Sequence, residues 1–222
     1  FCHNLVVGCL MGSFSVMLAS VEQRMGVTRA QSSGVGALVI FGSALMGSFV
    51  GPMFGKRSLR LLLLVGALAS LLGYLLLAFT TSYPLYVGSY LLLFGPSMAI
   101  AGSIGPATLV TRWFGRNRGV AMGLVHVNLI VAVMPLLSNW MLEHYGAQAV
   151  YLLMATIVGV TLIPATLLAR DYPPGAGPQV AESTGGGAGP SVWQILRTPA
   201  FWALSVTAGA IITGIMTLTF NM

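Results

Sequence analysis

TRWFGRNRGVAMG, residues Thr111–Gly123, is the most informative segment of the sequence for the fold. It crowds Arg112, Arg116 and Arg118 into a tight Gly-bearing turn, and an apolar run flanks it on each side. A hydrocarbon core of ~30 Å needs about 20 helical residues to cross, and both runs are that long. Because cationic turns stay on the cytoplasmic side of a membrane, the stretch predicts a short cytoplasmic turn between two spanning helices.

Composition places the chain in a bilayer. Of 222 residues, 56% are hydrophobic and only 6% are Asp, Glu, Lys or Arg, whereas a soluble domain carries roughly 25% charged residues. The net charge of +6 is gathered in a few turns rather than in a patch with interleaved aromatic residues. This placement argues against a nucleic-acid partner and favours the anionic inner surface of a membrane. The sequence therefore predicts an all-α membrane protein.

Six apolar segments of spanning length follow one another, after which the composition changes. A Pro- and Gly-rich linker is predicted to begin at Asp171, and a seventh segment begins near Thr198. The predicted domains are thus a six-helix bundle over 1–170, a linker over 171–197 and the start of a second bundle over 198–222. Because the chain starts and stops inside apolar runs, we expect it to be a piece of a longer protein. The six segments are about Phe1–Ser20, Ser32–Phe54, Leu61–Phe79, Leu85–Val110, Gly119–Leu142 and Ala149–Ala169.

The basic residues orient these segments. The turns after the second, fourth and sixth segments hold eight Lys or Arg residues, and those after the first, third and fifth hold two. The richer set is predicted to be cytoplasmic, which also places the N-terminus in the cytoplasm. The eight are Lys56, Arg57, Arg60, Arg112, Arg116, Arg118, Arg170 and Arg197, and the two are Arg24 and Arg29.

Local signals add detail to the helices. Gly8 and Gly12 have the GxxxG spacing that lets two helices approach closely. Thr28 and Gln31 have the spacing of a helix-capping box. Pro135 predicts a kink in the fifth segment. The Gly- and Pro-rich fourth segment is expected inside the bundle, because neighbouring helices or a cavity must satisfy a broken backbone at membrane depth.

Three stretches carry a resemblance to a known family. RWFGRNRGVAMGL (Arg112–Leu124) resembles the RWF-x-x-x-RG-x-A-x-G signature of the monocarboxylate porter and oxalate:formate antiporter branch of the major facilitator superfamily. MGVTRAQ (Met25–Gln31) and LRTPAFW (Leu196–Trp202) resemble the turn after helix one and the start of helix seven in its bacterial members. The resemblance implies the six-helix N-terminal half of a 12-helix fold built from 3+3 inverted repeats. It also implies a bacterial inner membrane, no enzymatic activity and no cofactor.

One family motif is incomplete. Members usually carry G-x-x-x-D-R-x-G-x-R between helices two and three, where an acid and cations clamp neighbouring helices. Gly51 and Arg60 fall on this pattern, but Gly55 stands at the position of the acid. The segment Glu143–Gln148 matches part of the same motif, which is consistent with the 3+3 repeat. The arginine turns are explained by topology alone or by topology plus a clamp, and both readings remain open. The gate and topology residues are Gly51, Lys56, Arg57, Arg60, Arg112, Arg116 and Arg118.

Few polar residues are predicted at membrane depth, and none of them is an acid. His126 and Asn128 lie about 10 and 13 Å of helix beyond Gly119, close to the midplane, where an ionisable group is costly and indicates a function. A histidine there could relay protons or donate to a carboxylate; a neutral histidine bonded to a neighbouring helix is the alternative. On one helix the two side chains would point about 200° apart. The candidate substrate and proton-pathway residues are His126, Asn128, Asn4, Ser97 and Ser103. His3 is a further, less central candidate. For both serines the alternative is a hydrogen bond to a carbonyl of their own helix.

The function predicted is secondary transport by alternating access. The resemblance indicates a small mono- or dicarboxylate, moved with a proton or in exchange. No Lys or Arg lies within the six segments, so a cation for an anionic substrate would lie in the absent half. Phosphate loops, catalytic pairs and metal-binding clusters are not visible. A drug or hydrophobic-solute exporter of the same fold is one alternative, and a transport-dead membrane sensor or scaffold is another.

Overall fold

The computed structural model describes residues 1–114, 117–172, 197–199, 201–203, 206–207 and 210. The chain forms two compact units, Phe1–Pro173 and Pro174–Met222. In the second unit, residues 199, 201–203, 206–207 and 210 are helical, and most of the predicted linker lies outside the described residues. The following account concerns the first unit.

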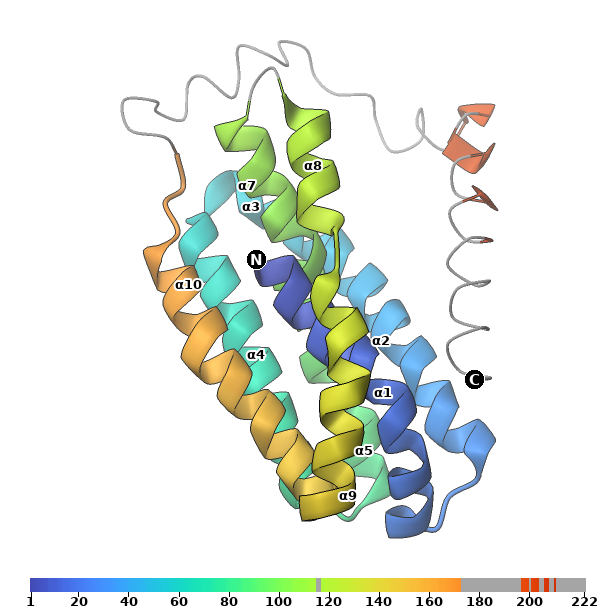
Figure 1. Ribbon diagram of the computed structural model, residues 1–222. Coiled ribbons are helices and arrows are strands. Elements are labelled where there is room, and N and C mark those ends of the chain that lie inside the picture. Colours follow the sequence, from blue (N-terminus) through green and yellow to red (C-terminus); the bar gives the residue numbers. More distant parts are fainter. Residues whose placement is uncertain (115–116, 173–196, 200, 204–205, 208–209, 211–222) are drawn as a thin grey trace. The chain divides into compact units, whose positions relative to one another are not determined.

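The first unit is a helical bundle, as the sequence predicts (Figure 1). Five stretches are long and apolar enough to cross a membrane. A four-residue helix, α3 (Met53–Lys56), lies between the second and third of them. The five are α1 (Cys2–Met25), α2 (Arg29–Val50), α4 (Leu59–Phe79) and two composite stretches, Tyr83–Trp113 and Arg118–Leu168.

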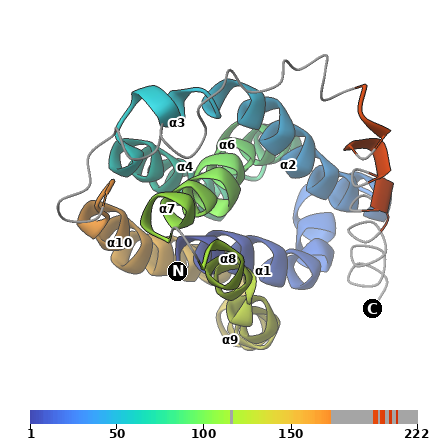
Figure 2. The ribbon, with the colours of Figure 1, turned by 90° about the horizontal axis from the view of Figure 1, so that it is seen from above.

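The composite stretch Tyr83–Trp113 runs through the middle of the bundle (Figure 2). It contains two wider π-helical turns, and its backbone nearly touches that of α2. A Cβ added to Gly95 would lie 3.0 Å from the Cα of Gly42. The prediction that this Gly- and Pro-rich segment lies inside the bundle is confirmed. Its parts are α5 (Tyr83–Ser89), η1 (Tyr90–Phe94), α6 (Gly95–Ser97), η2 (Met98–Ile104) and α7 (Gly105–Trp113).

The composite stretch Arg118–Leu168 has 51 residues. As one helix it would measure about 76 Å, more than twice a hydrocarbon core of ~30 Å. Gly146 interrupts it with φ 80° and ψ 174°, which confirms a turn within Glu143–Gln148. The chain reverses at the base of α9 and returns beside α4 (Figure 1). Its parts are α8 (Arg118–His126), α9 (Leu129–Ile157), η3 (Val158–Leu162) and α10 (Ile163–Leu168).

A second interruption separates α8 from α9. Val127 (φ −68°, ψ 100°) and Asn128 (φ −97°, ψ 76°) leave the helical region. The sequence prediction of one uninterrupted helix over Gly119–Leu142 is therefore wrong, because the chain leaves the helical region at Val127 and Asn128. Pro135, where the sequence predicts a kink, lies seven residues further on, inside α9. The backbone groups freed at the earlier position find partners on another helix, as described below.

Close helix contact explains how α1 reaches α9. A Cβ on Gly8 would lie 2.5 Å from the Cβ of Ile130, and one on Gly12 would lie 2.6 Å from that of Met134. Only a residue without a side chain fits this approach, so the predicted role of the GxxxG spacing is confirmed. The predicted capping box at the start of α2 is also present.

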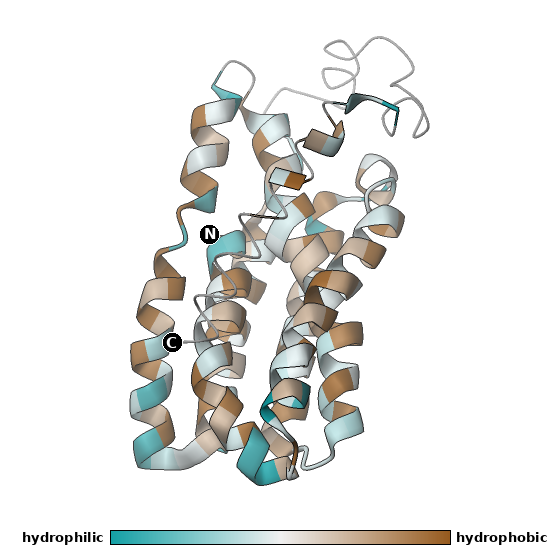
Figure 3. Ribbon diagram, turned by 90° about the vertical axis from the view of Figure 1, so that its right-hand side faces the viewer, coloured by the Kyte–Doolittle hydropathy of each residue, from teal (hydrophilic) through white to brown (hydrophobic). Residues whose placement is uncertain are grey.

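The outer helices present apolar side chains to their surroundings. Hydrophobic residues run along most of their length (Figure 3). A soluble protein rarely exposes so much contiguous apolar surface, whereas a bilayer favours it. Exposed examples are Phe41, Leu45 and Phe49 on α2, Leu61, Val65 and Leu72 on α4, and Val120, Leu124, Val133 and Leu136 on α8 and α9.

Candidate functional site

The break between α8 and α9 is held by a side chain from α1. Asn4 donates its Nδ2 hydrogen to the carbonyl of Val125 at 3.2 Å, and its Oδ1 accepts from the backbone N–H of Leu129 at 3.0 Å. These two backbone groups flank the break and lack helical partners there. One amide thus supplies a donor and an acceptor, which lowers the cost of interrupting a helix in apolar surroundings.

Two imidazole rings meet beside this break. His3 donates from Nδ1 to the carbonyl of Gly102 in η2, and His126 donates from Nδ1 to the carbonyl of Met122 at 2.8 Å. The ring centroids are 4.5 Å apart, with the planes tilted by 52°. His126 is exposed and His3 is half-buried. The sequence singled out His126 but treated His3 as peripheral, because no spacing rule relates residues 123 positions apart.

The remaining polar candidates differ in their surroundings. Asn128 has a buried Oδ1 without a hydrogen-bond partner among the described residues. Because the backbone of Asn128 is not helical, the expected angle of about 200° between the side chains of Asn128 and His126 does not apply. Ser97 is buried in α6 with its Oγ likewise unpartnered, so the prediction that it bonds back to its own helix is wrong. Ser103 is exposed. Asn4, His3 and His126 are therefore brought together, whereas neither serine bonds to them.

At one end of the bundle, which we call the basic end, lie Phe54–Arg60, Arg112–Trp113 and Arg170–Tyr172. Arg112 donates from Nη2 to the carbonyl of Phe54 at 2.6 Å, and its guanidinium lies 4.8 Å from the centre of the Tyr172 ring. Trp113 donates from Nε1 to the carbonyl of Arg170 at 3.1 Å. These contacts tie α7 to the turn after α2 and to the residues that follow α10.

Asp171 provides an acid at the turn where the family motif lacks one. Its carboxylate accepts from the backbone N–H groups of Leu59 at 3.2 Å and Arg60 at 3.1 Å, and from the Oγ of Ser58 at 3.4 Å. A carboxylate in this position caps α4 and complements its dipole. The sequence analysis assigned Asp171 to the linker, and no local signal relates it to a turn more than 100 residues earlier.

The other predicted gate residues make fewer contacts. Gly51 ends α2, and Lys56 lies in α3. Arg57 and Arg60 are exposed, and Arg118 donates from Nε to the carbonyl of Phe114 at 3.3 Å. Arg116 lies outside the described residues. Within the described part of the basic end, most of these side-chain hydrogen bonds go to backbone groups, Ser58 donates to the carboxylate of Asp171, and no ion pair forms.

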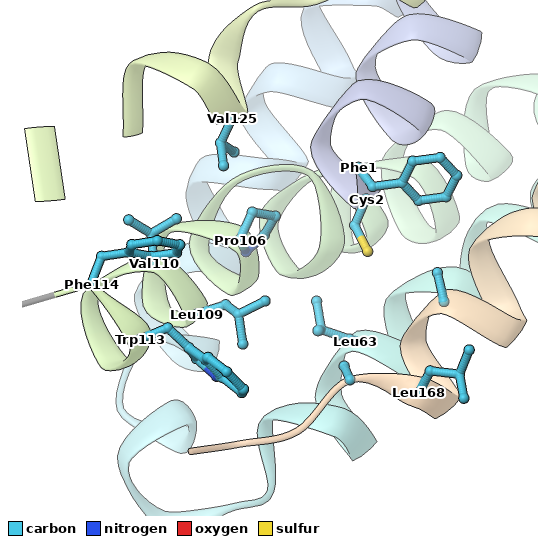
Figure 4. Close-up of a pocket in the computed structure, with 12 residues that line it drawn as sticks. Phe1, Cys2, Leu63, Pro106, Leu109, Val110, Trp113, Phe114, Val125 and Leu168 are labelled. Atoms are coloured by element: carbon cyan, nitrogen blue, oxygen red, sulfur yellow. The ribbon is translucent and has the colours of Figure 1, made fainter. Parts of the chain in front are cut away.

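A cavity of about 370 Å³ lies between the basic end and the helix break (Figure 4). Its lining is almost wholly apolar and comes from α1, α4, α7, α8 and the end of α10. Such a lining suits a hydrocarbon group rather than a charge. The labelled residues around it include Cys2, Leu63, Pro106, Leu109 and Val125.

Comparison with known proteins gives the family. The sequence profile of the Major Facilitator Superfamily matches residues 1–222. The chain belongs to this superfamily. Its members are membrane transporters rather than enzymes, so the predictions of a multi-pass membrane protein and of no enzymatic activity are confirmed. No solved structure matches the chain significantly.

Individual superfamily relatives are distant. Monocarboxylate transporter 13 of Bos taurus is 29% identical over 220 residues, covering 96% of this chain and 49% of that protein. The MFS-type transporter pytF of Aspergillus terreus is 30% identical over 101 residues, covering 45% of this chain and 33% of that protein. The uncharacterized MFS-type transporter YcxA of Bacillus subtilis is 21% identical over 179 residues, covering 79% and 44%. The chain spans about half, or less, of the length of these relatives.

Proposed function

We propose that the chain is the N-terminal half of a secondary transporter for a small mono- or dicarboxylate, moved with a proton or in exchange for another anion. Counting Arg118–Leu168 as two spans, divided at Gly146, gives six helices. Six helices correspond to one half of a 12-helix transporter with two 3+3 repeats. The coverage of about half of monocarboxylate transporter 13 supports this assignment.

The observation that carries the proposal is the polar cluster at the helix break. Asn4, His3 and His126 meet in a bundle whose described spans carry Lys and Arg only at their ends. Polar and ionisable groups are costly within a membrane and usually mark a substrate or ion pathway. A histidine changes charge near neutral pH, and so it suits a transporter that couples an anion to a proton.

The proposal also fixes a direction in the membrane. The basic end would face the cytoplasm of a bacterial cell, because Lys and Arg gather in cytoplasmic turns. Alternating access would then require the contacts of Arg112 and Asp171 to hold this half as a unit while it rocks against the other half. A fixed cation for the substrate would come from that other half.

The test uses the complete reading frame in de-energised vesicles. Lactate, pyruvate, oxalate and formate are added in turn, and external pH is recorded. We expect alkalinisation with at least one acid, abolished by an uncoupler and reduced at least about tenfold by His126→Ala. His144→Ala is the matched control, because His144 is also exposed and also donates from Nδ1 to a carbonyl of its own helix, at 2.9 Å. No pH change with any acid would refute proton-coupled transport of these acids.

The cavity supports a second candidate, transport of a hydrophobic solute. Its apolar lining offers no partner for a carboxylate. Energy-dependent efflux of a hydrophobic dye, with no response to the four acids, would favour this function. Dye efflux that is unaffected by Leu109→Gln, which places an amide in the cavity lining, would argue against use of the cavity.

A further inference from the structure

The hydrogen bonds of His3 and His126 define which nitrogen of each ring carries the proton. A backbone carbonyl can only accept a hydrogen bond. Both Nδ1 atoms bond to carbonyls, those of Gly102 and Met122, so both must carry hydrogen. In the neutral rings the Nε2 atoms are therefore the basic ones. Each ring is held in the tautomer that is ready to accept one further proton.

The closeness of the rings limits how many protons the pair accepts. With centroids 4.5 Å apart, a charge on one imidazole lies at contact distance from the other. Like charges this close disfavour the second ionisation, and such a pair titrates as a unit rather than as two independent groups. The pair is thus built to change its charge by one over a broad range of pH.

Other charges near the pair are few. On α1 the neighbouring titratable group is the thiol of Cys2. The η2 turn that accepts from His3 contains none, α8 has Arg118 at its far end, and α9 has no titratable residue before Glu143. Carboxylates that would favour a second proton are therefore missing from the described elements around the pair.

We propose that His3 and His126 form a one-proton site in which a singly protonated pair binds the carboxylate of the substrate. This inference rests on the proposed transport of a carboxylate. A proton from water adds to Nε2 of one ring, the exposed His126 presents the new N–H to a carboxylate oxygen, and the bond formed is a charge-assisted hydrogen bond. Release of the carboxylate and this one proton on the other side returns the pair to its neutral form, so no net charge moves.

The test is a titration that does not depend on transport. The complete protein, labelled with ¹⁵N-histidine and held in lipid nanodiscs, is followed by NMR from low to high pH. We expect both neutral rings to show Nδ1–H, and the pair to titrate in two steps separated by more than about one pH unit. Added formate should move the step at higher pH, at which the singly protonated pair becomes neutral, to still higher pH, and should not raise the step at lower pH.

Variants give the test a matched control. In His3→Gln the titration of His126 should collapse to a single step, whereas His144→Gln should leave the curves of His3 and His126 unchanged. Protonation of both rings in one step, an Nε2–H tautomer in either neutral ring, or a higher-pH step that formate does not move would each overturn the proposal. If His3→Gln does not fold, the curve of the unmodified protein decides alone. A two-step, formate-sensitive curve without transport in vesicles would reject the proposed function and retain the site.

Discussion

The helix break and the basic end are both held by side chains that bond to backbone groups of another part of the bundle, but they use different chemistry. At the basic end the side chains include the guanidinium of Arg112 and the carboxylate of Asp171. At the break they are the amide of Asn4 and the imidazole of His3. Charged side chains therefore hold the basic end together. Uncharged side chains hold the break, which lies between apolar helices, where burying a permanent charge would cost several kcal/mol.

This difference indicates that the basic end has a structural role and the helix break a functional one. The basic end is held by a guanidinium and a carboxylate that bond to backbone groups, so it suits a structural tie. The break instead contains the imidazole rings of His3 and His126, and histidine is the side chain that can gain a charge near neutral pH. Substitutions that separate structural from functional effects therefore sharpen the comparison, and four of them follow in order of expected effect.

Gly8→Leu should have the largest effect. The new side chain would collide with Ile130, since even a Cβ would lie 2.5 Å from the Cβ of that residue. Overfilling a packed contact costs about 1–3 kcal/mol or more, and α1 could no longer bring Asn4 to the break. We expect loss of the monodisperse peak in size-exclusion chromatography. Gly34→Leu is the control, because nothing lies within 4 Å of a Cβ at that position; similar profiles for both variants would contradict the packing argument.

Asn4→Leu should come next. It leaves the carbonyl of Val125 and the N–H of Leu129 without their partner, at a cost of about 1–3 kcal/mol. We expect a lower melting temperature together with loss of transport. Asn139→Leu removes an exposed amide whose one hydrogen bond among the described residues goes to Glu143, at 2.7 Å, and should change neither. An Asn4→Leu protein with the original stability would show that the break does not depend on Asn4.

Asp171→Ala tests the basic end. It removes the cap of α4 and should destabilise the protein by about 0.5–2 kcal/mol, measured by thermal unfolding in detergent. Glu143→Ala removes a carboxylate that accepts only from its own helix and should leave unfolding unchanged. Equal destabilisation by the two changes would mean that Asp171 contributes only its negative charge and not its hydrogen bonds to α4.

Tyr172→Leu should have the smallest effect. The aromatic ring beside Arg112 forms a cation–π contact between two half-buried groups, which contributes about 1 kcal/mol, and leucine lacks it. Tyr172→Phe keeps the ring and should behave like the original protein. Because the expected shift in unfolding is small, the comparison is between the two variants measured side by side; an equal loss in both would assign the effect to the hydroxyl instead.

Periodic and compositional patterns predicted the helical architecture. Apolar length located the spans, the Gly8–Gly12 spacing located a close contact, and Gly146 was within a predicted turn. These features succeeded because each depends on residues only a few positions apart. The helix break was missed for the opposite reason. Pro135 is the usual local signal for a kink, but the break at Asn128 is stabilised by Asn4, far away in sequence.

The candidate site shows the same limit. His126 could be singled out as an ionisable residue in an apolar segment, yet its neighbour His3 could not, because pairing across two helices follows from how those helices pack. Asp171 likewise looked like the first residue of a linker, and only the return of α10 beside α4 places it at the turn after α3.

The π-helical turns in the fourth span set how far α7 is rotated about the helix axis relative to α5. A π turn acts as a single extra residue inserted into an α-helix, and each residue of an α-helix advances the rotation by about 100°. Deleting one residue from Met98–Ile104 would therefore turn α7 by roughly a quarter of a revolution relative to α5. Arg112 would then point away from the carbonyl of Phe54. The number of residues in this span, and not only their identity, sets which way its end faces.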